Sequence, residues 1–162
     1  MALCLTSRKR CQRWGTPPAL LQILDEQYKF SRNPDGTLFD PCPIDWDPDI
    51  HPDGLSIDWA PSTFINPPYT GVADWLRKAA LEAQKGNQSV LLLNAVTDSV
   101  WFHTYCYKQP GVKVRFLRGR VPFVDPSNPK YKVANPSPSM LVIFRPHHKR
   151  CHDQNAGVVG TV

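Results

Sequence analysis

The sequence predicts a three-layer α/β fold with a mainly parallel sheet. Strand-like apolar runs alternate with segments whose apolar residues recur at helical spacing, which is the pattern of strand–helix units. The run 89–94 (SVLLLN) is almost wholly apolar, as expected for a strand buried on both faces of a parallel sheet. The length of 162 residues suits one domain.

The first helix is expected over residues 17–28. Its apolar positions recur at helical spacing and are Leu20, Leu21, Ile23, Leu24 and Tyr28. The Thr16 hydroxyl group would cap this helix, and Pro17 and Pro18 suit a first turn, where a missing N–H costs little. Residues 31–37 have turn composition, and residues 38–40 are expected to form a short strand.

The middle and the second half of the chain follow in the same way. Residues 41–61 are rich in proline and aspartate and are expected to be mostly loop, with a short strand near 55–57. Further strands are expected over 62–66, 89–94, 112–117 and 140–144. Helices are expected over 72–85, ended by Gly86 and Asn87, and over 100–107, capped by Asp98 or Ser99. Residues 119–131 are expected to form a loop.

Composition divides the chain into a basic N-terminal lead (1–13), an ordered domain (14–146) and a flexible C-terminal tail (147–162). Hydrophobic residues make up 41% of the chain, which is enough for one core. The net charge of +5 suits a polyanionic partner without requiring one. No apolar run approaches the ~20 residues needed to cross a bilayer, so we expect no membrane association.

The five cysteines are odd in number and form no CxxC motif, and no signal peptide precedes them. We therefore expect free thiols in a reducing cytoplasm. The histidines and the cysteine at 147–152 lack a second, well-separated pair of ligands, so we expect no metal site. The absence of a P-loop or a GxGxxG motif argues against nucleoside triphosphates and nicotinamide cofactors.

The segment Asn66-Pro67-Pro68-Tyr69 is the strongest candidate for a functional site. Proline cannot extend a central strand, so the strand that ends here must end in a stiff, extended corner. The Asn66 oxygen and nearby carbonyl groups are acceptors that suit a planar NH₂ group, and Tyr69 could stack on its ring for about 1–3 kcal/mol. No side chain here supplies an electrophile, so a cofactor must. The alternative is a turn that merely ends the strand.

This tetrapeptide matches the [D/N/S]PP[Y/F/W] signature of amino-group methyltransferases that use S-adenosylmethionine. Six further segments occur in an order that closely resembles the small bacteriophage-type DNA adenine-N6 methyltransferases. They are Thr16-Pro17-Pro18, Phe39-Asp40-Pro41-Cys42, Asp53-Gly54-Leu55 with Trp59, Thr97-Asp98 with Trp101-Phe102-His103, Arg118-Gly119-Arg120 and Pro138-Ser139-Met140. The resemblance covers about residues 14–146 and implies an abbreviated Rossmann-like methyltransferase fold.

The resemblance implies a catalytic role for Asn66, Pro67, Pro68 and Tyr69. The Asn66 side chain and the Pro67 carbonyl group would hold the amino group of an adenine flipped out of the duplex, and Tyr69 would stack on that base. The amine would then attack the methyl group of the sulfonium cofactor.

The resemblance also implies that S-adenosyl-L-methionine is bound by Thr16, Pro17, Asp40, Cys42, Asp53 and Asn66. Thr16 and Pro17 would border the methionine part, Asp40 would lie near its amino group or the ribose, and Asp53 would accept from the adenine amine. The usual glycine-rich turn is missing after Asp40, so the pocket must be abbreviated. Read only as local structure, Thr16 is a helix cap, and Asp40 and Asp53 are turn residues.

Arg118, Arg120, Lys130 and Lys132 are expected to face double-stranded DNA, with solvated surface charge as the alternative. We expect a monomer or a homodimer, in the cytoplasm of a bacterial host and possibly encoded by a phage or prophage. The expected function is site-specific methylation of adenine in DNA, of the kind that protects DNA in restriction–modification systems. The alternatives are methylation of cytosine or of a protein glutamine, and a non-catalytic DNA-binding module with a decayed cofactor pocket.

Overall fold

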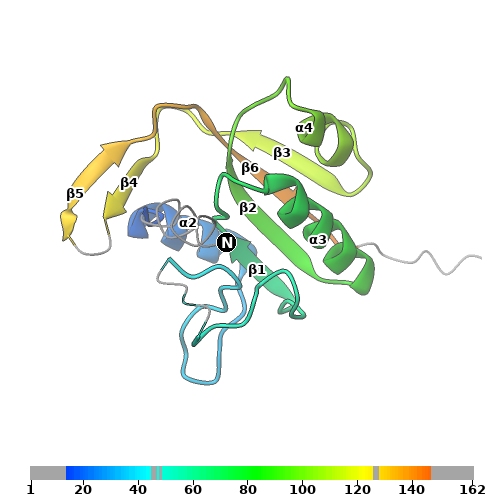
Figure 1. The fold of residues 1–162 in the computed structure, drawn as a ribbon, viewed down its shortest axis with the longest axis horizontal. Coiled ribbons are helices and arrows are strands. Elements are labelled where there is room, and N and C mark those ends of the chain that lie inside the picture. Colours follow the sequence, from blue (N-terminus) through cyan, green and yellow to red (C-terminus); the bar gives the residue numbers. More distant parts are fainter. Residues whose placement is uncertain (1–13, 45–46, 48, 126–127, 147–162) are drawn as a thin grey trace, which may run out of the picture.

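The computed structural model describes residues 14–44, 47, 49–125 and 128–146 (Figure 1). The expected N-terminal lead and C-terminal tail lie outside these residues. The elements are α2 (Pro18–Tyr28), β1 (Ser62–Ile65), α3 (Val72–Lys85), β2 (Gln88–Asn94), α4 (Val100–Tyr105), β3 (Val112–Phe116), β4 (Pro122–Asp125), β5 (Asn128–Ala134) and β6 (Ser139–Phe144). None of the helices in the described part of the chain has the length and apolarity needed to cross a membrane.

The main sheet is mixed, and most of its strand pairs are antiparallel. Its four strands lie in the order β1-β2-β6-β3. Only β1 and β2 pair in parallel, whereas β6 is antiparallel to both β2 and β3. The predicted three-layer, mainly parallel, Rossmann-like fold is therefore wrong. The cause is that a buried apolar run such as β6 has the same pattern in either direction.

The position of β6 decides where the other strands end. Because β6 is antiparallel to both of its neighbours, β1, β2 and β3 all run in the same direction. The carboxyl ends of these three strands therefore lie at the same end of the sheet, which is called here the Asn66 edge. Asn66 follows β1 at this edge, Asn94 ends β2 there, and Arg118 comes shortly after β3.

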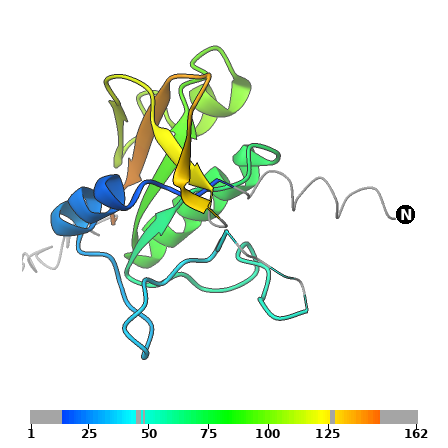
Figure 2. The same cartoon turned by 90° about the vertical axis from the view of Figure 1, so that its left-hand side faces the viewer.

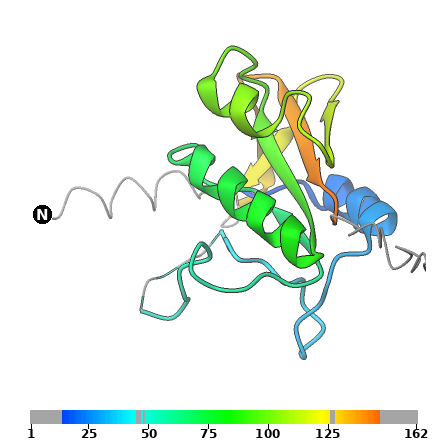
Figure 3. The ribbon, with the colours of Figure 1, turned by 90° about the vertical axis from the view of Figure 1, so that its right-hand side faces the viewer.

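Helices cover both faces of the sheet. α3 and α4 lie on one face and α2 lies on the other (Figure 3). The side chains of β2 alternate between these faces: Leu91 and Leu93 belong to the cluster that contains α3 and α4, and Val90 and Leu92 to the cluster that contains α2. The whole of 89–93 is buried, as the apolar run predicted.

Most of the predicted helices and strands are confirmed to within two residues. The Ser99 side chain caps α4 by accepting from the N–H group of Phe102, whereas the N-cap of α2 is Pro17 and its side chain makes no capping hydrogen bond, so the predicted Thr16 cap is wrong. Residues 38–40 contribute only an isolated bridge at Leu38, and residues 55–57 form turns. Both short strands predicted there are wrong, because the first segment pairs only locally with residues 31 and 32 and the second is turned back on itself.

The loop predicted over 119–131 is also wrong. β4 and β5 pair antiparallel to form a two-stranded sheet of their own, which projects from the main sheet (Figures 1 and 2). The prolines of this segment favoured the loop prediction, because proline is rare inside strands. Pro122, however, is the first residue of β4, where a missing N–H is tolerated. The hairpin also bonds to the segment before α2: Gly15 N donates to Val124 O at 2.7 Å, and Val124 N donates to Gly15 O at 3.0 Å.

A buried carboxylate holds the carboxyl end of α3. The Glu82 side chain is fully buried and accepts from Lys78 Nζ at 2.9 Å, Lys85 Nζ at 2.9 Å and Asn87 Nδ2 at 2.8 Å. Burial by itself would raise the pKa of Glu82, but the hydrogen bonds from Lys78, Lys85 and Asn87 bring it below its ordinary value. The helix that follows the Asn-Pro-Pro corner is thereby fixed at its far end.

Candidate active site

The Asn-Pro-Pro corner lies at the carboxyl end of β1, as the sequence predicted. Ile65, the last residue of β1, is fully buried and pairs with Leu91 of β2. Pro67 and Pro68 are buried and Asn66 is half-buried. The corner is thus a stiff segment fixed to the middle of the molecule, with one polar side chain left at its surface.

The amide group of Asn66 is oriented by the segment before α2. Asn66 Nδ2 donates a hydrogen bond to the carbonyl oxygen of Trp14 at 3.4 Å. This contact occupies the nitrogen side of the amide, and Oδ1 has no hydrogen-bond partner among the residues that the structure describes. The side-chain oxygen Oδ1 is therefore the atom of the Asn66 amide that can accept a hydrogen bond from a ligand.

A cavity of about 300 Å³ lies beside this amide. Its walls come from the segment before α2, from residues 38–44 and from the end of β1. The lining residues are Trp14, Gly15, Thr16, Leu21, Leu38, Phe39, Asp40, Cys42, Ile44, Phe64, Asn66 and Pro67. The cavity thus brings together five predicted site residues that are far apart in the sequence. A sixth, Pro17, is buried next to Thr16 and does not line the cavity.

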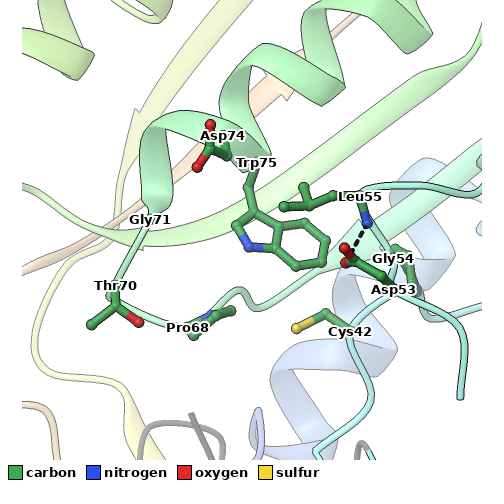
Figure 4. A pocket seen from close by; sticks show the side chains of 10 residues that line it. Cys42, Asp53, Gly54, Leu55, Pro68, Thr70, Gly71, Asp74 and Trp75 are labelled. Atoms are coloured by element: carbon green, nitrogen blue, oxygen red, sulfur yellow. Dashed lines mark hydrogen bonds between the residues drawn. The ribbon is translucent and has the colours of Figure 1, made fainter. Parts of the chain in front are cut away.

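A second, smaller cavity of about 60 Å³ also has Cys42 in its wall (Figure 4). It is lined by Pro41, Cys42, Asp53, Gly54, Leu55, Pro68, Thr70, Gly71, Asp74 and Trp75. Cys42 lines both cavities, so the two are neighbours. Together they surround the Asn-Pro-Pro corner and collect every predicted cofactor-binding residue except Pro17.

The two aspartates take part in turns, as their alternative interpretation predicted. Asp40 Oδ1 accepts from the N–H group of Cys42 at 2.8 Å, and Asp53 Oδ1 accepts from the N–H group of Leu55 at 3.1 Å. A carboxylate has two oxygens and about four acceptor positions, so one hydrogen bond within a turn does not use all of them. The turn role and the predicted cofactor role are therefore compatible.

Tyr69 and the predicted DNA-binding cations lie outside both cavities. Tyr69 is 45% exposed and follows the corner directly. Arg118 and Arg120 are exposed and follow β3 at the edge of the sheet that carries Asn66. Lys130 and Lys132 are exposed on β5 rather than on the predicted loop. No lysine or arginine is found among the described residues that line the two cavities.

Three residues that shape the site were not predicted as site residues: Trp14, Gly54 and Trp75. Trp75 is buried, forms a wall of the small cavity and stacks on Trp59 with ring centroids 6.1 Å apart. The position of Trp14, two residues before the predicted site residues Thr16 and Pro17, is a signal that could have identified it. Nothing in the local sequence indicated how closely Gly54 is packed.

A third cavity, of about 430 Å³, lies between α4 and β3 and contains no predicted site residue. Its one cysteine, Cys106, is buried, and burial raises the pKa of this thiol to about 12. The thiol therefore stays protonated at neutral pH and is a poor nucleophile. No group of three or more His, Cys, Asp or Glu side chains suited to a metal ion occurs within the described part of the chain.

Comparison with known proteins gives the chain a family. The family model described as DNA N-6-adenine-methyltransferase (Dam) matches residues 5–159. The chain is also similar to the DNA N-6-adenine-methyltransferase of Haemophilus phage HP1 (strain HP1c1), with 27% identity over 93 residues. That alignment covers 57% of this chain and 54% of the phage protein, so the chain spans about half the length of this relative. No solved structure matches the chain.

Proposed function

Because this chain belongs to the DNA N-6-adenine-methyltransferase family, we propose that it transfers a methyl group from S-adenosyl-L-methionine to the exocyclic amino group of adenine in DNA. The observation that carries this proposal is the placement of Asn66. Asn66 lines the larger cavity together with Thr16, Asp40 and Cys42, and its side-chain oxygen Oδ1 can accept a hydrogen bond there.

The corner would act as a clamp for the amino group. Asn66 Oδ1 and the Pro67 carbonyl oxygen would each accept one hydrogen of the adenine NH₂ group. Holding both hydrogens in this way draws the nitrogen lone pair out of conjugation with the ring and makes it a better nucleophile. The nitrogen would then form the new N–C bond with the donor's methyl group, the electron pair of the C–S bond would stay on sulfur, and one amine proton would pass to water.

The two cavities that share Cys42 fit a methyl donor of this kind. Small-molecule pockets occupy about 300–1,000 Å³, so the larger cavity is at the lower end of this range and the smaller one is too small by itself. Thr16, Asp40 and Cys42 would hold the methionine part on the side of the larger cavity, with Pro17 buried next to Thr16 and Asn66 facing the donor's methyl group. Asp53 would hold the adenine part on the other side, against the apolar wall of Trp75. S-adenosyl-L-methionine supplies the methyl group as an electrophile when it is bound.

The exposed cations would hold double-stranded DNA at the edge of the sheet where Asn66 lies. Arg118, Arg120, Lys130 and Lys132 would contact phosphates, and the target adenine would leave the duplex at a cost of a few kcal/mol. We propose site-specific action, in the cytoplasm of a bacterial host and by a monomer or homodimer, with protection of DNA from restriction as the biological readout.

The substitution Asn66→Ala tests the clamp. Methyl transfer should fall about 100-fold or more, as expected for loss of a group that stabilises the reacting centre. The affinity for S-adenosylhomocysteine should stay close to that of the wild type. The assay is transfer of a labelled methyl group to unmethylated DNA, followed by digestion to nucleosides and identification of the methylated one. Wild-type turnover by Asn66→Ala would remove the clamp from the mechanism.

The substitution Asn66→Asp is the matched control. It keeps acceptor oxygens at the clamp but loses the Nδ2 donor, so a carboxylate oxygen would face the Trp14 carbonyl oxygen. Methyl transfer should therefore fall below that of the wild type and stay above that of Asn66→Ala.

The same assay separates the alternatives. Label in N4-methylcytosine or in protein would indicate another amine as the substrate. Failure to bind S-adenosylhomocysteine in calorimetry, even at millimolar ligand, would indicate a DNA-binding module without catalysis.

A further inference from the structure

The segment Trp14-Gly15 connects the β4–β5 hairpin to the amide of Asn66. The backbone of Gly15 pairs with Val124 of β4 through two hydrogen bonds, of 2.7 and 3.0 Å. The carbonyl group of Trp14, directly before it, accepts from Asn66 Nδ2. One short piece of chain is thus a neighbour of the hairpin on one side and of the candidate catalytic side chain on the other.

The hairpin also holds the side chain of Trp14. The rings of Trp14 and Tyr131 of β5 lie 6.1 Å apart, with an angle of 34° between their planes. Trp14 is half-buried and lines the larger cavity, whereas Tyr131 is 55% exposed. The hairpin therefore fixes residue 14 through its backbone neighbour and through its ring.

Strand β5 carries two kinds of residue side by side. Lys130 and Lys132, on either side of Tyr131, are both exposed. The pairing of β5 with β4 shifts register between Val124 and Asp125, opposite this stretch. One strand thus presents two cations to solvent and, through Tyr131, supports the segment next to Asn66.

The contact between Trp14 and Asn66 is sensitive to position. Its length of 3.4 Å exceeds the usual 2.7–3.2 Å range of N–H···O hydrogen bonds. A further displacement of Trp14 by a few tenths of an ångström would break it. The Asn66 amide could then turn its Nδ2 group toward the cavity. Nδ2 is a hydrogen-bond donor and cannot accept a hydrogen bond from the substrate NH₂ group.

We propose that Tyr131 and Gly15 are positioning residues for methyl transfer. They hold the Trp14 carbonyl group against Asn66 Nδ2 and so keep Asn66 Oδ1 directed at the substrate amine. The hairpin then has two functions on one element, because it supplies cations for DNA and fixes the direction of the catalytic amide. This inference rests on the proposed function.

The first test is the substitution Tyr131→Ala, with Tyr131→Phe as the conservative variant. Loss of the ring contact should lower kcat about 3- to 10-fold, in line with the strength of aromatic pairs, and leave KM for DNA close to that of the wild type. Tyr131→Phe keeps the ring and should restore kcat. Tyr107→Ala removes a comparably exposed tyrosine on the far side of the main sheet and should change neither constant. A wild-type kcat in Tyr131→Ala, or a change confined to KM, would overturn the proposal.

The second variant, Gly15→Ala, crowds the segment without removing a ring. A Cβ at position 15 would lie 3.2 Å from Val124 Cγ2 and 3.4 Å from Ile44 Cδ1, so the segment or these side chains must give by a few tenths of an ångström. It should lower kcat as Tyr131→Ala does. If Tyr131→Ala fails to fold, this variant decides the question in its place, and an unchanged kcat would overturn the proposal.

A readout without catalysis separates this inference from the proposed function. The side-chain NH₂ resonances of Asn66 can be assigned by their loss in Asn66→Asp. They should shift in Tyr131→Ala and in Gly15→Ala and stay in place in Tyr131→Phe. Unshifted resonances in the first two would contradict the positioning role even if the enzyme methylates DNA. If the resonances shift in these two variants but the wild-type protein transfers no methyl group, the positioning role stands and the proposed function is refuted.

Discussion

Gly54 is required by the space around it rather than by its backbone conformation. A Cβ at this position would lie 1.8 Å from the carbonyl oxygen of Pro41 and 3.0 Å from Cη2 of Trp75. The carbonyl oxygen of Gly54 accepts from Trp59 Nε1 at 2.8 Å, so the loop cannot retreat without losing a buried hydrogen bond. This packing joins the two loops that form the small cavity.

The substitution Gly54→Ala should therefore damage both stability and the site. Overpacking costs about 1–3 kcal/mol in most cores, and here the clash is with backbone, so we expect the free energy of unfolding to fall by at least ~2 kcal/mol. The affinity for S-adenosylhomocysteine should also fall. Chemical denaturation and calorimetry measure the two effects.

The matched control is Gly36→Ala. It adds the same methyl group where nothing lies within 4 Å, at a φ of +86°. Only the strain of the left-handed backbone should then appear, about 1 kcal/mol, with no change in ligand affinity. Equal effects of the two substitutions would contradict the packing argument.

Helix α3 shows at the level of one element how a fixed helix supports the corner before it. Its amino end follows Asn66-Pro67-Pro68 closely, its first turn carries Trp75, and its carboxyl end is held by Glu82. Removing the charge in Glu82→Gln would leave Lys78 and Lys85 without their shared partner. We expect the free energy of unfolding to fall by about 1.5–3 kcal/mol, as for other hydrogen bonds to charged groups.

The control on the same helix is Asp74→Asn. The ion pair of Asp74 with Arg77 has side chains that are 56% and 65% exposed, so its loss should change the free energy of unfolding by less than about 1 kcal/mol. Urea denaturation of the two variants compares them directly. A similar small loss in both would show that the Glu82 cluster does not hold the helix.

Glu82 also predicts how stability depends on pH. Its pKa in the folded protein lies below its ordinary value of 4.5. Its contribution is therefore fully present above pH 4.5 and is lost as the pH falls through the lower, folded value. Wild-type stability should decline more steeply than that of Glu82→Gln below about pH 4.5 in acid titrations followed by circular dichroism. Parallel declines would contradict this assignment.

The whole molecule places charge and chemistry at one edge. Because β1, β2 and β3 run in the same direction, the segment with Arg118 and Arg120 leaves the sheet at the same end as Asn66, although β1 and β3 are the two outer strands. Lys29 lies toward the opposite edge, since Ser31 bonds through its N–H group to Ser62 O at the amino end of β1.

Replacing Arg118 and Arg120 together with alanine should weaken DNA binding and reduce the slope of log K against log salt by up to about 1.8, or 0.9 for each phosphate contact. Lys29→Gln removes one charge at the other edge and should leave the slope unchanged. Fluorescence anisotropy with a labelled duplex at several salt concentrations measures both. An unchanged slope in the double variant would place these arginines outside the interface.

Much of the local structure was predictable from the sequence, because it depends on neighbouring residues. Helical spacing predicted α2 and α3, and the unbroken apolar run of β2 predicted its burial on both faces. Prolines without N–H groups predicted where β1 ends, and so placed Asn66 at the tip of a strand. The candidate motif was identified in this way, and the catalytic role of its residues stays a prediction.

Contacts between distant residues were decided only by the tertiary structure. The direction of β6, the pairing of Gly15 with Val124, the approach of Gly54 to Pro41 and the bond from Asn66 to Trp14 each join segments that are separate in sequence. An apolar strand has the same pattern in either direction, and a glycine in a turn does not reveal what lies against it. The sequence by itself therefore determined which residues form the motif, whereas the fold decided which surfaces enclose it.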